Sequence, residues 1–521
     1  MKDGVMMVNR RLPPEAGAHC GIECFRKLLV GSLLLASVLY EGSTCQQAAA
    51  VDESSVVDSV VRVIVTRREP NPAQPWTRSA PMDASGTGFV IAGNRLVTNA
   101  HVVSYASQIY VQPAKSPDKF AATIESFAPE IDLAVLKVED VSFFEGRPAI
   151  PIDSRLPRIK SPVNVYGFPV GGEQISVTEG IISRVDFTVY GTETSGLLVQ
   201  IDAALNPGNS GGPAISNGKL VGVAFRMLQR AENVGYLIPA EELETFLNDI
   251  QDGTYTGKPR LAAEMQTVEN DALRARLKLP KGVGGGYVIR AGGGDYPLRV
   301  GDVITHIGET AIDQNARVKV SDDVIVQFPY LLSKMERDGK VPIRVFRDGA
   351  SVDLLLPAYP KSGAGLPSLR NDYPSYFIFG PLVFSRATRE YLTAAGGFTA
   401  VLLARGNPMV TRAFEPMPAT SDELVIVASP LFSHRITKGY SNSTGAVVAA
   451  INGVRITSLA QLVETLRDAR GEFVEIDFVD RGVERLIFRL AELRAATEEI
   501  LADNSIRKQY SDDLEKHWRK P

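Results

Sequence analysis

Cysteine is scarce in this sequence, and all of it lies near the N-terminus. The three cysteines, Cys20, Cys24 and Cys45, fall within the first 50 of 521 residues. A chain that loses those residues holds no cysteine, so its fold is predicted to contain no disulfide. Many secreted proteins depend on disulfides, and this absence argues against an ordinary member of that class.

Neither sign of charge dominates the chain. It has 56 lysine and arginine residues against 60 aspartate and glutamate residues, which gives a formal net charge of −4. Without a basic excess or a basic run, there is no electrostatic case for a nucleic acid partner. No group of histidine, cysteine and acidic residues has metal-ligand spacing, so we expect no metal and no other cofactor.

Long apolar runs are missing too, and the candidate nearest the N-terminus covers only residues 28–40. A membrane-spanning helix needs about 20 apolar residues, so this run fits the core of a signal peptide behind Arg26-Lys27. With a cleavage site available at Ala48-Ala49-Ala50, we expect residues 1–50 to export the chain to the periplasm or another extracytoplasmic place. The alternative is an uncleaved membrane anchor through residues 28–40. Three acidic residues argue against an organellar transit peptide: Asp3, Glu15 and Glu23.

The chain is long enough for about three domains. Short predicted strands separated by turn signals recur to about residue 240, which is typical of an all-β barrel or sandwich. A linker-like stretch at residues 253–259 leads into mixed strands and helices. The predicted domains cover residues 51–257, 258–358 and 366–490, and a charged helical tail over residues 491–521 follows them.

One glycine-rich turn carries the first chemical signal. The segment Asn206-Pro-Gly-Asn-Ser-Gly-Gly-Pro213 lies between strands predicted over residues 197–202 and 219–225. Glycines let several backbone N–H groups converge on one point. Ser210 in such a turn can attack a carbonyl while those N–H groups hold the developing oxyanion. Taken alone, the segment also fits a β-turn with an incidental serine.

Two further residues complete the pattern. His101 lies just past an apolar strand that a hairpin backs, and Asp132 heads an otherwise apolar strand. A buried carboxylate is costly unless it is paired, and an imidazole would pair it. Separately, His101 fits a packed core histidine and Asp132 a turn residue. Together with Ser210, in the order His-Asp-Ser, they predict a base, an orienting acid and a nucleophile.

The segments Thr98–His101, Asp132–Lys137 and Gly208–Pro213 resemble the three catalytic blocks of HtrA/Deg-type serine endopeptidases. The resemblance covers most of residues 55–250, and residues 166–172 and 200–204 are more similar to the plant organellar Deg branch and its bacterial relatives than to the familiar periplasmic branch. It implies a mainly β fold: a chymotrypsin-like double β-barrel, then two PDZ-like α+β domains. It also implies trimers or multiples of trimers, and cleavage of unfolded or damaged proteins without ATP, which is protein quality control.

The residues that would bind substrate follow from this resemblance. The oxyanion would be held by backbone N–H groups within Gly208, Asn209 and Ser210. Apolar residues at the expected specificity pocket predict cleavage after small or medium aliphatic residues, with Val223–Phe225 pairing with the substrate as an added strand. The residues expected at that pocket are Ala204, Leu205, Val223, Ala224 and Phe225.

Residues 298–304 look like the leading motif of a PDZ domain, and peptide C-termini would bind its loop at Gly285, Gly286, Tyr287 and Val288. Helices are predicted over residues 239–252, 324–335 and 458–469, and strands over residues 341–347 and 473–478. The second PDZ-like unit departs from the pattern, because Pro381 removes an N–H group from its presumed carboxylate loop. It would bind internal segments, bind another subunit, or only pack.

Three functions remain in view at this point. The first is the endopeptidase. The second is a proteolytically silent PDZ chaperone or peptide-binding scaffold, and the third is a secreted digestive protease, which the missing cysteines argue against. The Pro-rich loop at residues 69–76 is expected to be a surface connection, although the resemblance places a regulatory loop there.

Overall fold

The computed structural model describes residues 53–170, 172, 174–190, 194–225, 234–360, 365–413 and 422–519. The predicted leader, its cleavage site and the alternative anchor at residues 28–40 lie outside these ranges. Within them, no helix is long and apolar enough to cross a membrane.

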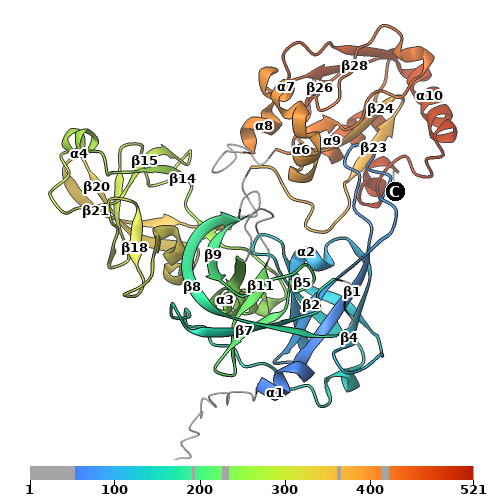
Figure 1. Cartoon of the computed structure of the whole chain (residues 1–521). Helices are drawn as coiled ribbons and strands as arrows, with labels where there is room; N and C mark the ends of the chain where they lie inside the picture. The colour runs from blue at the N-terminus through green and yellow to red at the C-terminus, as the bar shows by residue number, and fades with distance from the viewer. Residues whose placement is uncertain are drawn as a thin grey trace, which may run out of the picture. The chain divides into compact units, whose positions relative to one another are not determined.

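The N-terminal part, drawn in blue in Figure 1, is a closed six-stranded barrel. Its strand order is β1-β2-β3-β6-β5-β4. Side chains that alternate along each strand fill the interior of this barrel. In β1, Val61, Val63 and Val65 point inward and are at most 1% exposed. The strands are β1 (Val60–Arg67), β2 (Met82–Ile91), β3 (Arg95–Thr98), β4 (Ala106–Pro113), β5 (Phe120–Ala128) and β6 (Leu133–Val138).

A second closed barrel follows, with the strand order β10-β11-β12-β9-β8-β7. Its strands are β7 (Pro162–Gly167), β8 (Ser176–Tyr190), β9 (Thr194–Ile201), β10 (Pro213–Ser216), β11 (Lys219–Phe225) and β12 (Gly235–Pro239). The closing helix predicted over residues 239–252 is confirmed as α3 (Ala240–Asp249) and a short 3-10 turn. Glu241 and Glu242 lie in its first turn, where they complement the helix dipole.

Residues 259–360 form the first α+β domain, whose sheet has the order β14-β15-β16-β20-β21. The predicted strand over residues 341–347 is confirmed as β20, but the helix expected over residues 324–335 is mostly replaced. That segment forms the strand β19 (Ile325–Gln327), the 3-10 turn Phe328–Leu331 and only one turn of helix, α5 (Leu332–Met335). The other elements are β13 (Pro259–Arg260), β14 (Ala263–Thr267), α4 (Asp271–Leu277), β15 (Gly286–Ala291), β16 (Val303–Ile307), β17 (Thr310–Ala311), β18 (Arg317–Lys319), β20 (Lys340–Arg347), β21 (Ala350–Pro357) and β22 (Tyr359–Pro360).

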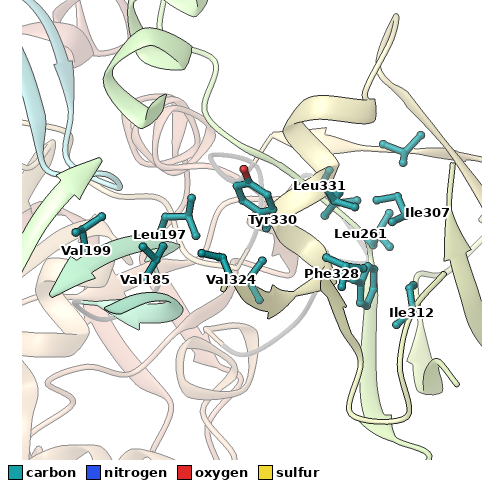
Figure 2. Close-up of a cluster of buried hydrophobic side chains, with 14 of the residues drawn as sticks. Val185, Leu197, Val199, Leu261, Ile307, Ile312, Val324, Phe328, Tyr330 and Leu331 are labelled. Atoms are coloured by element: carbon teal, nitrogen blue, oxygen red, sulfur yellow. The ribbon is translucent and has the colours of Figure 1, made fainter. Parts of the chain in front are cut away.

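A continuous apolar cluster joins the C-terminal barrel to this domain (Figure 2). We call it the apolar seam. On the barrel side it contains Val185, Leu197 and Val199, and on the domain side Val324, Phe328, Tyr330 and Leu331, all buried. At the border of the seam the Tyr330 hydroxyl donates to Glu241 Oε1 over 2.9 Å, so this buried tyrosine also has a hydrogen-bond partner.

The second α+β domain has two small sheets, β23-β24-β25 and β27-β26-β28-β29. The helix predicted over residues 458–469 and the strand predicted over residues 473–478 are both confirmed, as α9 and β28. Its strands are β23 (Tyr376–Phe379), β24 (Leu382–Arg386), β25 (Val425–Val427), β26 (Val448–Ile451), β27 (Val454–Arg455), β28 (Phe473–Phe478) and β29 (Leu486–Arg489). Its helices are α6 (Arg389–Ala395), α7 (Thr399–Ala404), α8 (Pro408–Arg412), α9 (Leu459–Asp468), α10 (Leu490–Asp503) and α11 (Glu515–Trp518).

The charged tail is part of this domain, whereas the sequence suggests a solvated helix. After α10 the chain turns back along the outer edge of β23. Ile378 N donates to the Gln509 carbonyl over 2.8 Å, and the Ser511 N–H donates to the Tyr376 carbonyl over 3.0 Å. Leu514 is 1% exposed within the domain core. The chain's own tail therefore pairs with the outer edge of β23.

Candidate active site

The predicted base and its predicted orienting acid are in direct contact. His101 lies on α2 (Ala100–Val103), a single helical turn directly after β3. Its Nδ1 is 2.7 Å from Asp132 Oδ2, and its backbone N–H donates to Asp132 Oδ1 over 2.8 Å. The Asn99 side-chain amide donates to the Asp132 carbonyl over 2.9 Å. The carboxylate therefore fixes both the ring and the backbone of His101.

The electrostatics of this pair suit a general base. Burial acts to lower the pKa of His101, but the charge of Asp132 and its hydrogen bond outweigh burial, so the pKa is raised above 6.5. Arg67 acts weakly in the lowering direction on the pKa. The imidazole side chain is half exposed, so it remains accessible from solvent.

The Ser210 turn packs against the N-terminal barrel at the residues that lead to His101. Thr87 N donates to the Ser210 carbonyl over 2.9 Å, and Gly211 N donates to the Ala224 carbonyl over 3.0 Å. Gly211 has a φ of 86°, and a Cβ there would lie 2.2 Å from the Thr87 carbonyl oxygen and 3.0 Å from Asn99 N. Only glycine fits this close approach. The Ser210 hydroxyl itself makes no hydrogen bond within the described chain, and such bonds are often long in proteins without substrate.

Two of the three backbone N–H groups predicted to hold the oxyanion have no acceptor in the described residues. Those of Gly208 and Ser210 donate to no acceptor in the described ranges. The peptide before Gly208 is fixed because the Pro207 carbonyl accepts from Val170 N over 2.7 Å. The expectation for Asn209 is wrong, since its N–H donates to the Asn206 carbonyl over 3.0 Å and is unavailable.

Thr87 is a residue to which the sequence assigns no chemistry. It is fully buried; its hydroxyl donates to the Gly208 carbonyl over 2.7 Å and accepts from Phe168 N over 2.9 Å. It thus fixes the peptide between Gly208 and Asn209, which directly follows the peptide that carries the Gly208 N–H group. The sequence feature that could have indicated a role for Thr87 is its position between Gly86 and Gly88, because small neighbours allow close packing.

The predicted pocket residues divide into two groups. Ala204 is exposed, Leu205 is half-buried, and the Phe225 ring centre lies 6.4 Å from that of His101. Val223 and Ala224, by contrast, are completely buried in the barrel cores. Their strand is paired with β10 on one side and β12 on the other, so neither residue offers a side chain or a free strand edge to substrate. For these two the prediction is corrected.

The predicted peptide-binding loop of the first α+β domain is also corrected. Residues 286–288 begin β15, an interior strand that pairs with β14 and with β16, and Gly285 directly precedes it. Gly285 N donates to the Asp313 carbonyl, and Val288 N donates to the Asp302 carbonyl. A strand that is hydrogen-bonded on both sides cannot accept a peptide by strand addition. In the described residues the two outer strands of this sheet are β14 and β21, and the far edge of β14 has no strand partner.

Two other histidines, His306 and His434, make local side-chain contacts. His306 lies in β16 with its Nδ1 3.0 Å from the Thr305 hydroxyl, a strand residue as expected. His434, which lacks a predicted partner, has its Nε2 3.1 Å from Glu499 Oε2. In the described ranges, no three histidine, cysteine or acidic residues gather as metal ligands would.

Comparison with known proteins places this site in a class. The family described as "Trypsin-like peptidase domain" matches residues 86–223, and the family described as "PDZ domain" matches residues 367–513. The double barrel and these matches define a trypsin-like serine peptidase that carries a PDZ domain. "Protease Do-like 4, mitochondrial" from Arabidopsis thaliana is 32% identical over 479 residues, which cover 89% of this chain and 88% of that protein. The chain belongs to this Do-like, or HtrA/Deg, protease family.

A second relative agrees with that assignment. "Protease Do-like 2, chloroplastic" from Arabidopsis thaliana is 30% identical over 473 residues, covering 89% of this chain and 77% of the relative. The inferred proximity to the plant Deg branch is therefore confirmed. A solved structure of "HtrA-type protease AlgW with tripeptide" is 24% identical, covers 59% of this chain and 95% of its own, and has a TM-score of 0.47.

Proposed function

We propose that this serine protease cleaves unfolded or damaged proteins internally, without ATP, as a quality-control enzyme. The observation that carries the proposal is the His101–Asp132 pair, with both carboxylate oxygens engaged, beside the turn that presents Ser210. A scaffold that only bound peptides would have no use for that pair. A free nucleophile turn with two unoccupied N–H donors supports the same reaction class.

The reaction would be acyl transfer. Ser210 Oγ attacks the scissile carbonyl while His101 Nε2 accepts the hydroxyl proton, and His101 then returns the proton to the leaving amine. Asp132 holds Nδ1–H and stabilises the imidazolium form. The N–H groups of Gly208 and Ser210 hold the oxyanion, and each such donor contributes about 3–4 kcal/mol to stabilising the transition state. Water then attacks the acyl-enzyme in the same way: His101 accepts its proton and returns the proton to Ser210 Oγ as the acyl group leaves.

Substrate selection would rest on the accessible apolar residues. Ala204, Leu205 and Phe225 offer no acidic group to a basic side chain, which supports cleavage after small or medium aliphatic residues. Peptide C-termini would add to the free edge of β14 in the first α+β domain, because strand addition needs an unpaired edge. A peptide-library digest with cuts mainly after lysine or arginine would overturn the first point.

The deciding experiment compares hydrolysis of casein by the chain from Val51 onward with hydrolysis by Ser210→Ala. We expect activity in the first protein and a loss of about 10⁶-fold in kcat in the second. Ser216→Ala is a matched control, because Ser216 lies six residues away in β10. If neither protein cleaves while both bind peptide and suppress aggregation, the silent scaffold is the correct reading.

Assembly and location are further parts of the proposal. We propose a homotrimer or a multiple of it, which sedimentation of the purified chain tests directly. We also propose export through residues 1–50 to an extracytoplasmic compartment. Names of the relatives point to mitochondria or chloroplasts instead. The N-terminal sequence of the mature protein, recovered from fractionated source cells, distinguishes the two destinations.

A further inference from the structure

The turn that carries His101 is held from outside the barrel. α2 has only four residues, too few for a helix that is stable by itself. Tyr105 follows it with a φ of 53°, a left-handed conformation that costs free energy in a residue other than glycine. Its backbone N–H donates to the side-chain oxygen of Asn371, which belongs to the second α+β domain. Asn371 therefore fixes the chain just after His101.

The turn before Asp132 has a similar contact. Asp132 itself has a φ of 53°. Two residues earlier, Glu130 Oε1 lies 3.3 Å from Arg370 Nη2, and both side chains are partly buried. The second Glu130 oxygen is buried without a hydrogen bond within the described residues. Arg370 is thus the ion-pair partner of a carboxylate in the turn that presents Asp132.

Arg370 and Asn371 are themselves firmly attached to the second domain. Glu390 of α6 accepts hydrogen bonds from the Ser368 hydroxyl over 2.6 Å and from Leu369 N over 2.9 Å. The turn closes where Asp372 N donates to the Leu369 carbonyl over 2.8 Å. The contacts to Tyr105 and Glu130 are consequently made by a fixed turn.

Aromatic contacts strengthen the same attachment. The Tyr373 hydroxyl donates to the Arg68 carbonyl over 2.8 Å, and the Arg78 guanidinium lies 3.7 Å from the Tyr373 ring centre. Trp76 packs against Tyr376 and Phe432, with ring centres 6.4 and 5.7 Å away. The loop at residues 69–76 is therefore a contact with the second domain, and its prediction as a surface connection is wrong.

We infer that Arg370 and Asn371 are positioning residues, through which the second α+β domain holds His101 and Asp132 in their reactive geometry. The inference rests on the proposed function, since it concerns the same site. Neither side chain touches the reacting atoms; each acts on the backbone turn beside them. A displacement of about 1 Å in a catalytic group can cost on the order of 10²-fold in rate, so a loosened turn lowers kcat and leaves substrate binding unchanged.

The first test uses Asn371→Ala, which removes the acceptor for Tyr105 N–H, in the chain from Val51 onward. We expect kcat on a peptide substrate to fall about tenfold while KM stays within about twofold. Asn371→Asp keeps an acceptor oxygen and should restore most of the rate. Asn442→Ala is the matched control, because Asn442 is an exposed residue of the same domain whose side-chain hydrogen bonds, among the described residues, go to Thr444.

The second test measures the pKa of His101 by NMR of labelled histidine in the same chain from Val51 onward, with His101→Gln used for assignment among its four histidines. The charges acting on the ring are Asp132, which raises the pKa, and Arg67, which lowers it. Looser contact with Asp132 should move the pKa downward in Asn371→Ala. This readout needs no turnover, so it judges the inference even if Ser210→Ala cleaves as well as the parent and the proposed function falls. An unchanged pKa and an unchanged kcat in a folded Asn371→Ala protein would overturn the inference alone.

Discussion

The two barrels carry their α+β domains in different ways. The C-terminal barrel meets the first domain through the apolar seam, in which Leu197 and Phe328 are at most 1% exposed. The N-terminal barrel meets the second domain through polar and aromatic contacts of partly buried residues such as Asn371 and Tyr373. Apolar burial contributes about 25 cal/mol per Å², whereas partly exposed ion pairs contribute about 0–1 kcal/mol. The first attachment is therefore the stronger one.

The two barrels also differ in how they hold the predicted catalytic residues. The C-terminal barrel supplies Ser210 from a turn fixed by backbone hydrogen bonds and by glycines that tolerate no side chain. The N-terminal barrel supplies His101 from one helical turn that depends on side-chain contacts at both ends. The weaker domain attachment thus lies beside the more easily displaced half of the site. Changes on the two sides should separate rate from stability.

The largest effect is expected from Asp132→Asn on the N-terminal side. The asparagine cannot hold the imidazole in the required tautomer, and kcat should fall about 10⁴-fold. Because the pKa of His101 is raised, the parent rate should increase with pH through a midpoint above 6.5, and this midpoint should move downward in the variant. Rate against pH measures both effects. Asp118→Asn, an exposed change in the same barrel, should leave the profile unaltered; a parent midpoint below 6.5 would contradict the assignment.

Next in size is Phe328→Ala in the apolar seam. Removing a buried phenylalanine costs about 3–5 kcal/mol, and the loss should appear in chemical denaturation and as faster protease nicking at residues 253–259. Ile325 lies three residues away and is 52% exposed. Ile325→Ala should therefore change the free energy of unfolding little. Equal losses from both variants would mean that the seam is not what holds this domain.

A smaller loss in the free energy of unfolding is expected from Leu514→Ala in the tail of the second domain. Leu514 is 1% exposed, and truncating a buried leucine costs about 2–5 kcal/mol, reduced where the site can collapse. Thermal unfolding should shift for the second domain, while the active-site serine remains reactive toward a fluorophosphonate. Lys516→Ala serves as the exposed comparison. A tail that merely lies in solvent would show no difference between the two.

The smallest effect on stability is expected from Arg370→Ala. Its pair with Glu130 is partly exposed, so its loss should change the free energy of unfolding by no more than about 1 kcal/mol. The change should shrink further near 1 M salt, where the screening length is about 3 Å. Denaturation at low and high salt measures it. A salt-independent loss of several kcal/mol would mean that the attachment of the second domain is stronger than the apolar seam.

Much of the site could be predicted from the sequence, because local patterns encode it. The order of His101, Asp132 and Ser210, and the glycines around Ser210, are short-range signals that also define the strands beside them. Predictions failed where burial and pairing decide the outcome. Val223 and Ala224 were predicted to face the substrate, but both are enclosed by neighbouring strands. Residues 285–288 were predicted to form a ligand-binding loop, but residues 286–288 lie in an interior strand and Gly285 directly precedes it.

The sequence by itself determined the family, the two-barrel fold and the three predicted catalytic residues, since periodicity and turn chemistry are written locally in the chain. Only the tertiary structure decided which strand edges are free and which are filled, as the Gln509 segment fills that of β23. It alone placed Trp76 and Asn371 at the junction of the N-terminal barrel and the second domain. Contacts between residues some 270 to 300 positions apart depend on how whole domains pack, and no local pattern records that packing.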